Sequence, residues 1–207
     1  MTIIEKVYGN FVLTTMESPD TAINFFNENI VVFNNIERFE TKEDLINFEH
    51  MFWFYSSALF ERGRYNDTID IVLKFLPIIE IGIEEFEIDK SSDKHYKRII
   101  YEKARASYNL NDYNAAFNDF KELSSYEPNN DRYKNWLSSS NNGKQQRIIN
   151  ALCIFGTIGL ITDVVGGKSI PKEPRVFIIS ISLIFLIIAL VMQIIISRNK
   201  RRRKSNL

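Results

Sequence analysis

The stretch VFIISISLIFLIIALVMQIII, residues 176–196, decides what kind of protein this chain can be. Its 21 residues include no charged side chain. A helix rises about 1.5 Å per residue, so a helix of this length covers the roughly 30 Å hydrocarbon core of a bilayer. We therefore expect residues 176–196 to form a transmembrane helix.

A second apolar run, IINALCIFGTIGLITDVVGG, covers residues 148–167 and is interrupted by an asparagine, an aspartate and four glycines. An acid inside a bilayer is unfavourable, so this run is the weaker of the two. It fits either a second transmembrane helix or a re-entrant or interfacial segment. We expect it to span, which makes a transmembrane helical hairpin with a short external loop at residues 168–175.

Four polar residues of the two runs lie at matched depths and are expected to meet across this hairpin: Asn150, Asp163, Ser180 and Gln193. Gly156 and Gly159 share a helical face with Asp163, and small residues let membrane helices approach closely. Asp163 is either a functional intramembrane acid, such as part of a proton or ion relay, or a hydrated group near the interface.

The tail, residues 197–207, carries an orientation signal. Six of its residues are basic: Arg198, Lys200, Arg201, Arg202, Arg203 and Lys204. The loop at residues 168–175 has three basic residues and one acidic residue, so the positive-inside rule places the tail in the cytoplasm. Two crossings return the N-terminal domain to the same side, and we expect an integral protein of a bacterial inner membrane with both termini cytoplasmic. A single-span, tail-anchored arrangement is the alternative.

The whole chain has 26 basic and 26 acidic residues, but the charges are unevenly distributed. Residues 1–147 have 17 basic and 24 acidic residues, whereas residues 148–207 have 9 and 2. One cysteine and two histidines offer no Cys/His metal site, and no phosphate-binding loop or nucleophile elbow occurs. We therefore expect an acidic domain joined to a basic membrane segment, with no metal, no cofactor, no nucleic-acid partner and no enzymatic activity.

The acidic domain is predicted to be all-α, because proline and glycine are scarce and apolar residues recur at helical spacing. Ser18 followed by Pro19 predicts one helix start, and Thr41 with Asp44 predicts another as a capping box. We expect an N-terminal helical segment at residues 1–40, which packs on a helical repeat domain at residues 41–141. A linker is expected to follow at residues 142–147.

The segment YNLNDYNAAFNDFKELSSYEPNN, residues 108–130, resembles the second half of a tetratricopeptide repeat. Seven residues at and before this segment fall on family positions 8, 12, 17, 20, 24, 27 and 32 in turn: Ala104, Tyr108, Tyr113, Ala116, Phe120, Leu123 and Pro128. Asn111 stands where the family usually has glycine, and Leu123 stands where it has a small residue. The resemblance implies stacked helical hairpins that cross closely at their small residues.

A weaker match, FWFYSSALFERGRYNDTIDIVLKF, covers residues 52–75 and aligns Gly63 with Asn111. These positions are 48 residues apart, whereas the family repeats about every 34. The 14 extra residues are expected to lengthen the second helix of the first repeat, which Pro77 would kink.

In this family the first helix of each repeat lines a concave groove that holds peptides or helices. Carrying the groove positions over to this chain selects eight residues: His50, Trp53, Ser57, Phe60, Arg98, Tyr101, Arg105 and Tyr108. Aromatic and arginine side chains are enriched at binding hot spots, and an acidic group would suit the space between Arg98 and Arg105. Trp53 or Tyr101 could instead pack against residues 1–40, and this alternative stays open.

Together the resemblance and the apolar runs imply a membrane-anchored adaptor or scaffold. Its cytoplasmic helical domain would bind a protein partner and localise that partner to the membrane, and its hairpin would contact lipid and could pair with other copies. The alternative is a subunit of an oligomeric pore or transporter, in which the hairpin is the active part and the helical domain regulates it.

Overall fold

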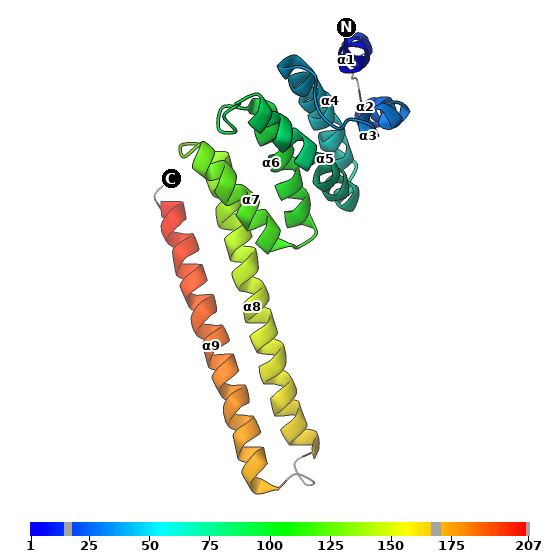
Figure 1. Ribbon diagram of the computed structural model, residues 1–207. Coiled ribbons are helices and arrows are strands. Elements are labelled where there is room, and N and C mark those ends of the chain that lie inside the picture. The colour runs from blue at the N-terminus through cyan, green and yellow to red at the C-terminus, as the bar shows by residue number, and fades with distance from the viewer. Residues whose placement is uncertain (15–17, 167–170, 206–207) are drawn as a thin grey trace. The chain divides into compact units, whose positions relative to one another are not determined.

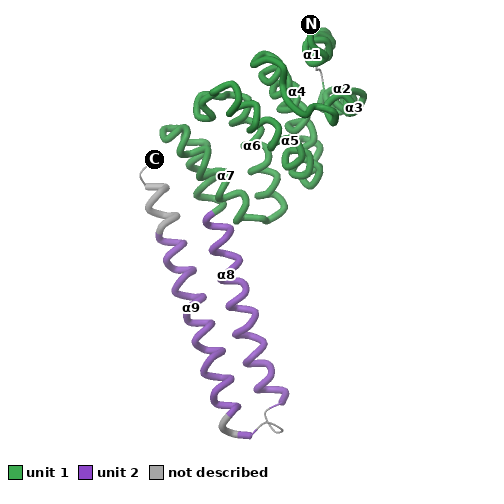
Figure 2. Tube along the Cα trace, viewed as in Figure 1, with its two compact units in different colours: residues 1–140 green, residues 141–207 purple. Residues whose placement is uncertain are grey.

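The computed structural model describes residues 1–14, 18–166 and 171–205, and these contain helices and connecting turns but no strand. The all-helical prediction is confirmed. The chain divides into two compact units, residues 1–140 and 141–207 (Figure 2). Each unit is described by itself below.

Unit 1 consists of short and medium helices that follow one another along the chain (Figure 1). They are α1 (Ile3–Leu13), α2 (Pro19–Glu28), α3 (Ile30–Asn34), α4 (Lys42–Glu61), α5 (Tyr65–Glu85), α6 (Lys94–Asn109), α7 (Tyr113–Tyr126) and the start of α8 (Asp131–Gly166). Helix α4 contacts α1, α2, α5 and α6, and α6 also contacts α5 and α7. The middle of the unit is therefore built around α4 and α6.

Local chemistry explains where these helices begin. The Ser18 hydroxyl accepts a hydrogen bond from the Thr21 amide with Pro19 as the first helical residue, and Thr41 and Asp44 form a reciprocal capping box, as predicted. Asp93 caps α6 in the same manner, accepting from two backbone amides.

Two aligned positions share an unusual backbone conformation. Gly63, after α4, has φ of 71°, and Asn111, after α6, has φ of 62°. This left-handed conformation favours glycine and is tolerated by asparagine, which explains why these two residue types occupy the turns. The α4–α5 and α6–α7 connections therefore turn in the same way.

Aromatic rings fill the core between α2, α4 and α5. The Phe52 ring lies 5.8 Å from Phe26, 5.7 Å from Phe48 and 5.4 Å from Phe75, measured between centroids. Phe48 and Phe52 are fully buried. Such rings contribute a large buried area and contacts with defined geometry, so this cluster is a main source of stability in unit 1.

Small residues let α6 and α7 approach each other. Ala104 on α6 and Ala116 on α7 are both fully buried, and α6 contacts α7 extensively. Beside them, the buried Tyr96 hydroxyl donates to Glu80 on α5 at 3.0 Å and lies 3.3 Å from a Glu122 oxygen on α7. Burial and the two carboxylates raise the pKa of Tyr96, so its phenol stays protonated and links three helices.

Unit 2 contains two helices that are long and apolar enough to cross a membrane, from α8 (Asp131–Gly166) and α9 (Lys172–Ser205). The linker expected at residues 142–147 is instead helical and belongs to α8, although Gly143 lies within it. The loop was expected at residues 168–175, but α9 already begins at Lys172, directly after Pro171. The described part of the loop is therefore shorter than expected. Proline in the first turn, here Pro174, is compatible with a helix because those amides lack helical partners anyway.

Glycines mark the contact between α8 and α9 within unit 2. A Cβ atom on Gly159 would collide with the Ser182 side chain, and one on Gly156 would lie 2.8 Å from Leu186 Cγ. Ser182 and Ala189 on α9 are almost completely buried. The two helices therefore touch through small residues, as apolar helices in a bilayer do.

The polar residues of the hairpin have partners other than those expected from matched depth. Asp163 pairs with the Arg175 guanidinium, and the Ser180 hydroxyl donates to the Val176 carbonyl at 2.8 Å within its own helix. Asn150 accepts from Gln146 at 3.0 Å, also within one helix. Hydroxyl and amide side chains find these local partners because they are available along the same helix.

Gln193 lines a shallow surface cavity with Ile194, Ser197 and Arg198. The predicted tail at 197–207 continues α9 as far as Ser205. Of its six cations, the side chain of Arg198 is described and exposed, whereas those of Lys200, Arg201, Arg202, Arg203 and Lys204 lie outside the described part of the structure.

Candidate partner-binding surface

Helices α4 and α6 lie side by side in unit 1 and bring most of the predicted groove residues together (Figure 1). The Arg98 guanidinium lies 4.0 Å from the centre of the Trp53 ring, and the Arg105 guanidinium lies 3.8 Å from the centre of Phe60. In each case the ring comes from α4 and the cation from α6. The two helices are thus joined by cation–π contacts, which stabilise most where water is partly excluded.

The residues on the inner side of this surface are buried or already have an ion-pair partner within unit 1. Phe60 is 9% exposed and Tyr101 is 5% exposed. Arg105 donates to the Glu102 carboxylate at 2.9 Å. Burial raises the pKa of Glu102, and Arg105 opposes that rise. The acidic group expected near Arg105 is therefore supplied by the chain itself, one helical turn away on α6.

Tyr101 packs against the C-terminal helices of unit 1. It lies against Phe120 of α7, with ring centres 5.9 Å apart, and against Tyr133 of α8, at 5.8 Å. Tyr108 is half-buried beside Trp136, at 5.1 Å. These two predicted groove residues help to attach the first turns of α8 to α6.

The N-terminal segment does cover His50. The Nδ1 atom of His50 is 3.0 Å from the Tyr8 hydroxyl on α1. The His50 ring lies 4.8 Å from the ring of His95, the second residue of α6. Burial lowers the pKa of His50, with Arg98 adding to the effect. Burial and His50 together lower the pKa of His95 to about 4, so both rings are neutral near pH 7.

A buried carboxyl next to this histidine pair escaped the sequence argument. Glu49 on α4 is completely buried, and neither of its oxygens has a hydrogen-bond donor among the described residues. Burial, reinforced by the negative charge of Asp93, raises the pKa of Glu49 to about 9. The carboxyl is therefore protonated at neutral pH and can share its proton with Asp93. A glutamate on a helix usually faces solvent, so no sequence signal identified it.

Ser57 lies at the edge of a small cavity between α2 and α4. The cavity has a volume of about 340 Å³, and its wall includes Pro19, Ala22, Trp53 and Phe54. Trp53 therefore has one face against Arg98 and an edge toward residues of the N-terminal segment. The alternative, packing against residues 1–40, therefore holds in part for Trp53 and His50. It does not hold for Arg98.

One cation of this surface was missed. The Arg132 guanidinium on α8 lies 4.3 Å from the centre of the Tyr101 ring. Arg132 follows Arg98 by 34 residues, about the length of one tetratricopeptide repeat, so a third repeat frame would have selected it. Arg98 and Arg132 both act to lower the pKa of Tyr133, against the stronger effects of burial and Glu127, so both lie within electrostatic reach of that phenol.

We call the surface formed by these two arginines and the rings they cover the guanidinium face. Its members are Trp53, Arg98, Tyr101, Arg132 and Tyr133. Among the residues whose side chains are described, neither Arg98 nor Arg132 forms an ion pair. The face thus presents two guanidinium groups over aromatic rings, and Arg132 also lies within electrostatic reach of Glu102, whose pKa it acts to lower against the effect of burial.

Within residues 1–14, 18–166 and 171–205, no group of three or more His, Cys, Asp or Glu side chains is arranged to hold a metal ion. His50 and His95 are neighbours, but no third such side chain joins them among the described residues. A scan against protein-family models, a search of curated proteins and a search of solved structures each found no match to this chain.

Proposed function

We propose that this protein is a non-enzymatic adaptor, held in a membrane by α8 and α9, whose helical unit binds an acidic peptide segment of a partner protein on the guanidinium face. The observation that carries the proposal is the pair Arg98 and Arg132. Each covers an aromatic ring, and neither has a carboxylate partner in the described structure. Their charge is available to a ligand.

The chemistry of the face selects the ligand. A guanidinium that lies over a ring keeps its N–H edge free for a bidentate contact with a carboxylate. The half-buried Trp53 ring supplies apolar area, and aromatic and arginine residues are those that most often dominate binding energy. A segment with acidic residues next to apolar anchors matches both features.

The repeat resemblance supports this proposal. The left-handed positions Gly63 and Asn111 occupy equivalent turns, and Ala104 and Ala116 are buried where family members need small residues. In a tetratricopeptide arrangement, α4 and α6 would be the first helices of two repeats. Those helices carry the ligand in that family.

The membrane attachment has its own support. The apolar windows of α8 and α9 have mean hydropathies of 2.0 and 2.9, and only 11% of each is buried. The proposed orientation puts both termini in the cytoplasm of a bacterial cell, where anchoring raises the effective concentration of the domain toward membrane-bound partners. A cysteine at Ser205, in a chain with Cys153→Ala, should then react with an impermeant maleimide only from the cytoplasmic side. Labelling from the opposite side alone would support the tail-anchored arrangement.

The test of the adaptor compares two charge reversals in the intact protein, solubilised in a neutral detergent. Arg98→Glu combined with Arg132→Glu should abolish co-purification of the partner, whereas Lys121→Glu, an exposed change on α7, should not. Acidic peptides with leucine anchors should show the same dependence. A partner retained equally by both variants would exclude the guanidinium face as its binding site. The fluorescence of the two tryptophans, both in unit 1, checks that each variant is folded.

The pore or transporter alternative receives less support from the hairpin. Asp163 is the acid that motivated it, and its charge is compensated by Arg175 at the end of the hairpin.

A further inference from the structure

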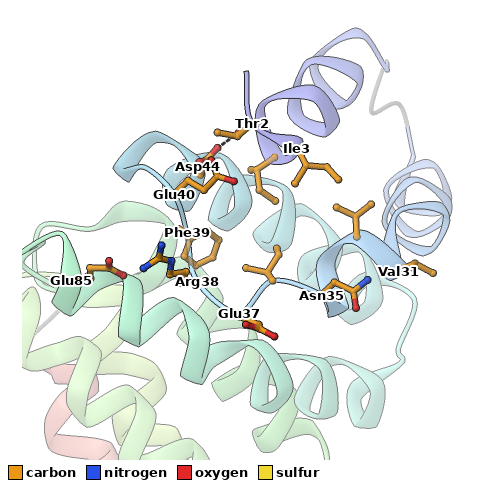
Figure 3. Close-up of a pocket in the computed structure, with 13 residues that line it drawn as sticks. Thr2, Ile3, Val31, Asn35, Glu37, Arg38, Phe39, Glu40, Asp44 and Glu85 are labelled. Carbon is orange, nitrogen blue, oxygen red and sulfur yellow. Dashed lines mark hydrogen bonds between the residues drawn. The ribbon is translucent and has the colours of Figure 1, made fainter.

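A cavity of about 770 Å³ opens near the start of unit 1, where α1, α3, the connection to α4 and the end of α5 meet (Figure 3). Its volume lies in the usual range for ligand sites, roughly 300–1,000 Å³. None of its wall belongs to the guanidinium face. It is therefore a separate candidate site.

The floor of this cavity is apolar and partly uncovered. Ile3 is 56% exposed and Val31 is 68% exposed, although both are large aliphatic residues. Ile36 is half-buried and Phe39 is 2% exposed, and both also line the cavity. Figure 3 shows Ile3 from α1 and Val31 from α3 on the same side of the opening. Apolar side chains from segments that are far apart in the sequence thus lie together at the opening of the cavity.

The rim of the cavity is acidic. Glu37, Glu40 and Glu85 are exposed there and Arg38 is the accompanying cation, so the solvent-facing rim is negative (Figure 3). In the described part of the chain, none of the three glutamates forms an ion pair. A fourth carboxylate, Asp44, is buried and is occupied by the Thr2 hydroxyl and the Thr41 amide.

These two features define an occupant. We infer that the cavity is a second docking site, for a partner segment that carries lysine or arginine beside an aliphatic anchor. The anchor covers Ile3 and Val31, and the cations meet Glu37, Glu40 and Glu85 at the rim. An anionic segment or an anionic lipid headgroup is disfavoured, because like charges at the rim repel it. The charge preference is opposite to that of the guanidinium face.

The two sites make the helical unit bivalent. An acidic segment binds at Arg98 and Arg132, and a basic segment binds at the cavity, so a partner that carries both is held more tightly than by either site. The cavity proposal does not depend on the proposed function of the guanidinium face, because it uses different residues.

The experiment measures binding of a fluorescein-labelled peptide, acetyl-Leu-Lys-Lys-Leu-Lys-amide, to the intact protein in zwitterionic nanodiscs by fluorescence anisotropy. A second peptide with glutamate in place of lysine is the ligand control. We expect the lysine peptide to bind more tightly than the glutamate peptide. Glu37→Lys combined with Glu40→Lys should weaken the lysine peptide about tenfold or more, since charge reversal turns attraction into repulsion. Val31→Asp should weaken it several-fold.

Glu43→Lys is the matched protein control, because this exposed acid lies on the first turn of α4 outside the cavity wall. Equal weakening by Glu43→Lys would show that net charge alone attracts the peptide and would overturn the site. Equally tight binding of the aliphatic amine hexylamine would overturn the peptide class. Tenfold tighter binding after deletion of residues 198–204 would identify the basic tail of the chain itself as the occupant. Arg98→Glu/Arg132→Glu should leave the affinity unchanged, which separates this result from that of the adaptor proposal.

Discussion

The two units of this protein bury opposite kinds of residue. In unit 1 the helices meet through aromatic rings, and the buried polar groups bond from one helix to another, as Tyr96 does with Glu80. In unit 2 the helices meet through Gly159 and Ser182, while Phe155 and Ile187 are 63% and 60% exposed. The apolar residues are inside one unit and outside the other.

The difference follows from the surroundings that favour each kind of packing, water for unit 1 and hydrocarbon for unit 2. In water, burial of apolar area drives helices together, so large rings belong at the contacts. In hydrocarbon that drive is absent, and close approach of backbones through small residues takes its place. Removal of a large ring should therefore destabilise unit 1, whereas addition of a large side chain at the helix contact should destabilise unit 2.

Phe52→Ala should cause the largest loss. It removes a fully buried ring from the cluster between α2, α4 and α5, and such changes lower the free energy of unfolding by about 3–5 kcal/mol. Urea unfolding of the intact protein in nanodiscs, followed by tryptophan fluorescence, reports on unit 1, since both tryptophans lie there. Leu73→Ala, at a position 55% exposed, is the control and should change stability by less than about 0.5 kcal/mol.

Glu49→Gln should stabilise unit 1 in a manner that depends on pH. The folded pKa is raised from 4.5 to about 9, so the contribution of the protonated carboxyl is complete below pH 4.5 and declines as the pH rises toward 9. Glutamine does not titrate, so the variant lacks this decline. Its advantage over the natural chain should reach on the order of 2–4 kcal/mol at pH 8 and vanish near pH 5. A constant difference between pH 5 and 8 would mean that Glu49 is ionised in the folded protein.

Gly159→Leu should separate the hairpin while leaving unit 1 intact. The added side chain meets Ser182, and overpacking costs about 1–3 kcal/mol. With a protease site inserted after Ile170, cleaved halves should co-migrate in mild detergent for the natural sequence and dissociate for the variant. Ile158→Leu, a change at a 54% exposed position, should behave as the natural sequence does. Dissociation in both variants would argue against a contact through Gly159.

Asp163→Asn should have the smallest effect. The pair that Asp163 forms with Arg175 lies apart from the contact through Gly159 and Ser182, so that contact is retained. The cleaved halves should remain associated, and co-purification of the partner should be unchanged. Loss of an activity that depends on the hairpin, with recruitment intact, would favour the pore or transporter alternative.

Some parts of the partner surface followed from the sequence and others did not. The repeat frame selected Trp53 and Arg98, which lie together in the structure. It also selected Tyr101, which is buried, because a family frame gives the helix and the position but not what packs over it. Glu49 and the contact between His50 and His95 had no sequence signal. They depend on the exact rotation and crossing of α4 and α6, which no local pattern encodes.

The sequence by itself determined the features that depend on neighbours along the chain. Helix starts at Ser18 and Thr41, the two apolar spans and the division into an acidic and a basic part are all local properties, set by caps, periodicity and composition. Only the tertiary structure decided which side chains from different helices meet. It gave Asp163 its arginine and left Arg98 and Arg132 without an ion pair among the described side chains, because long-range contacts follow from how whole helices pack against one another.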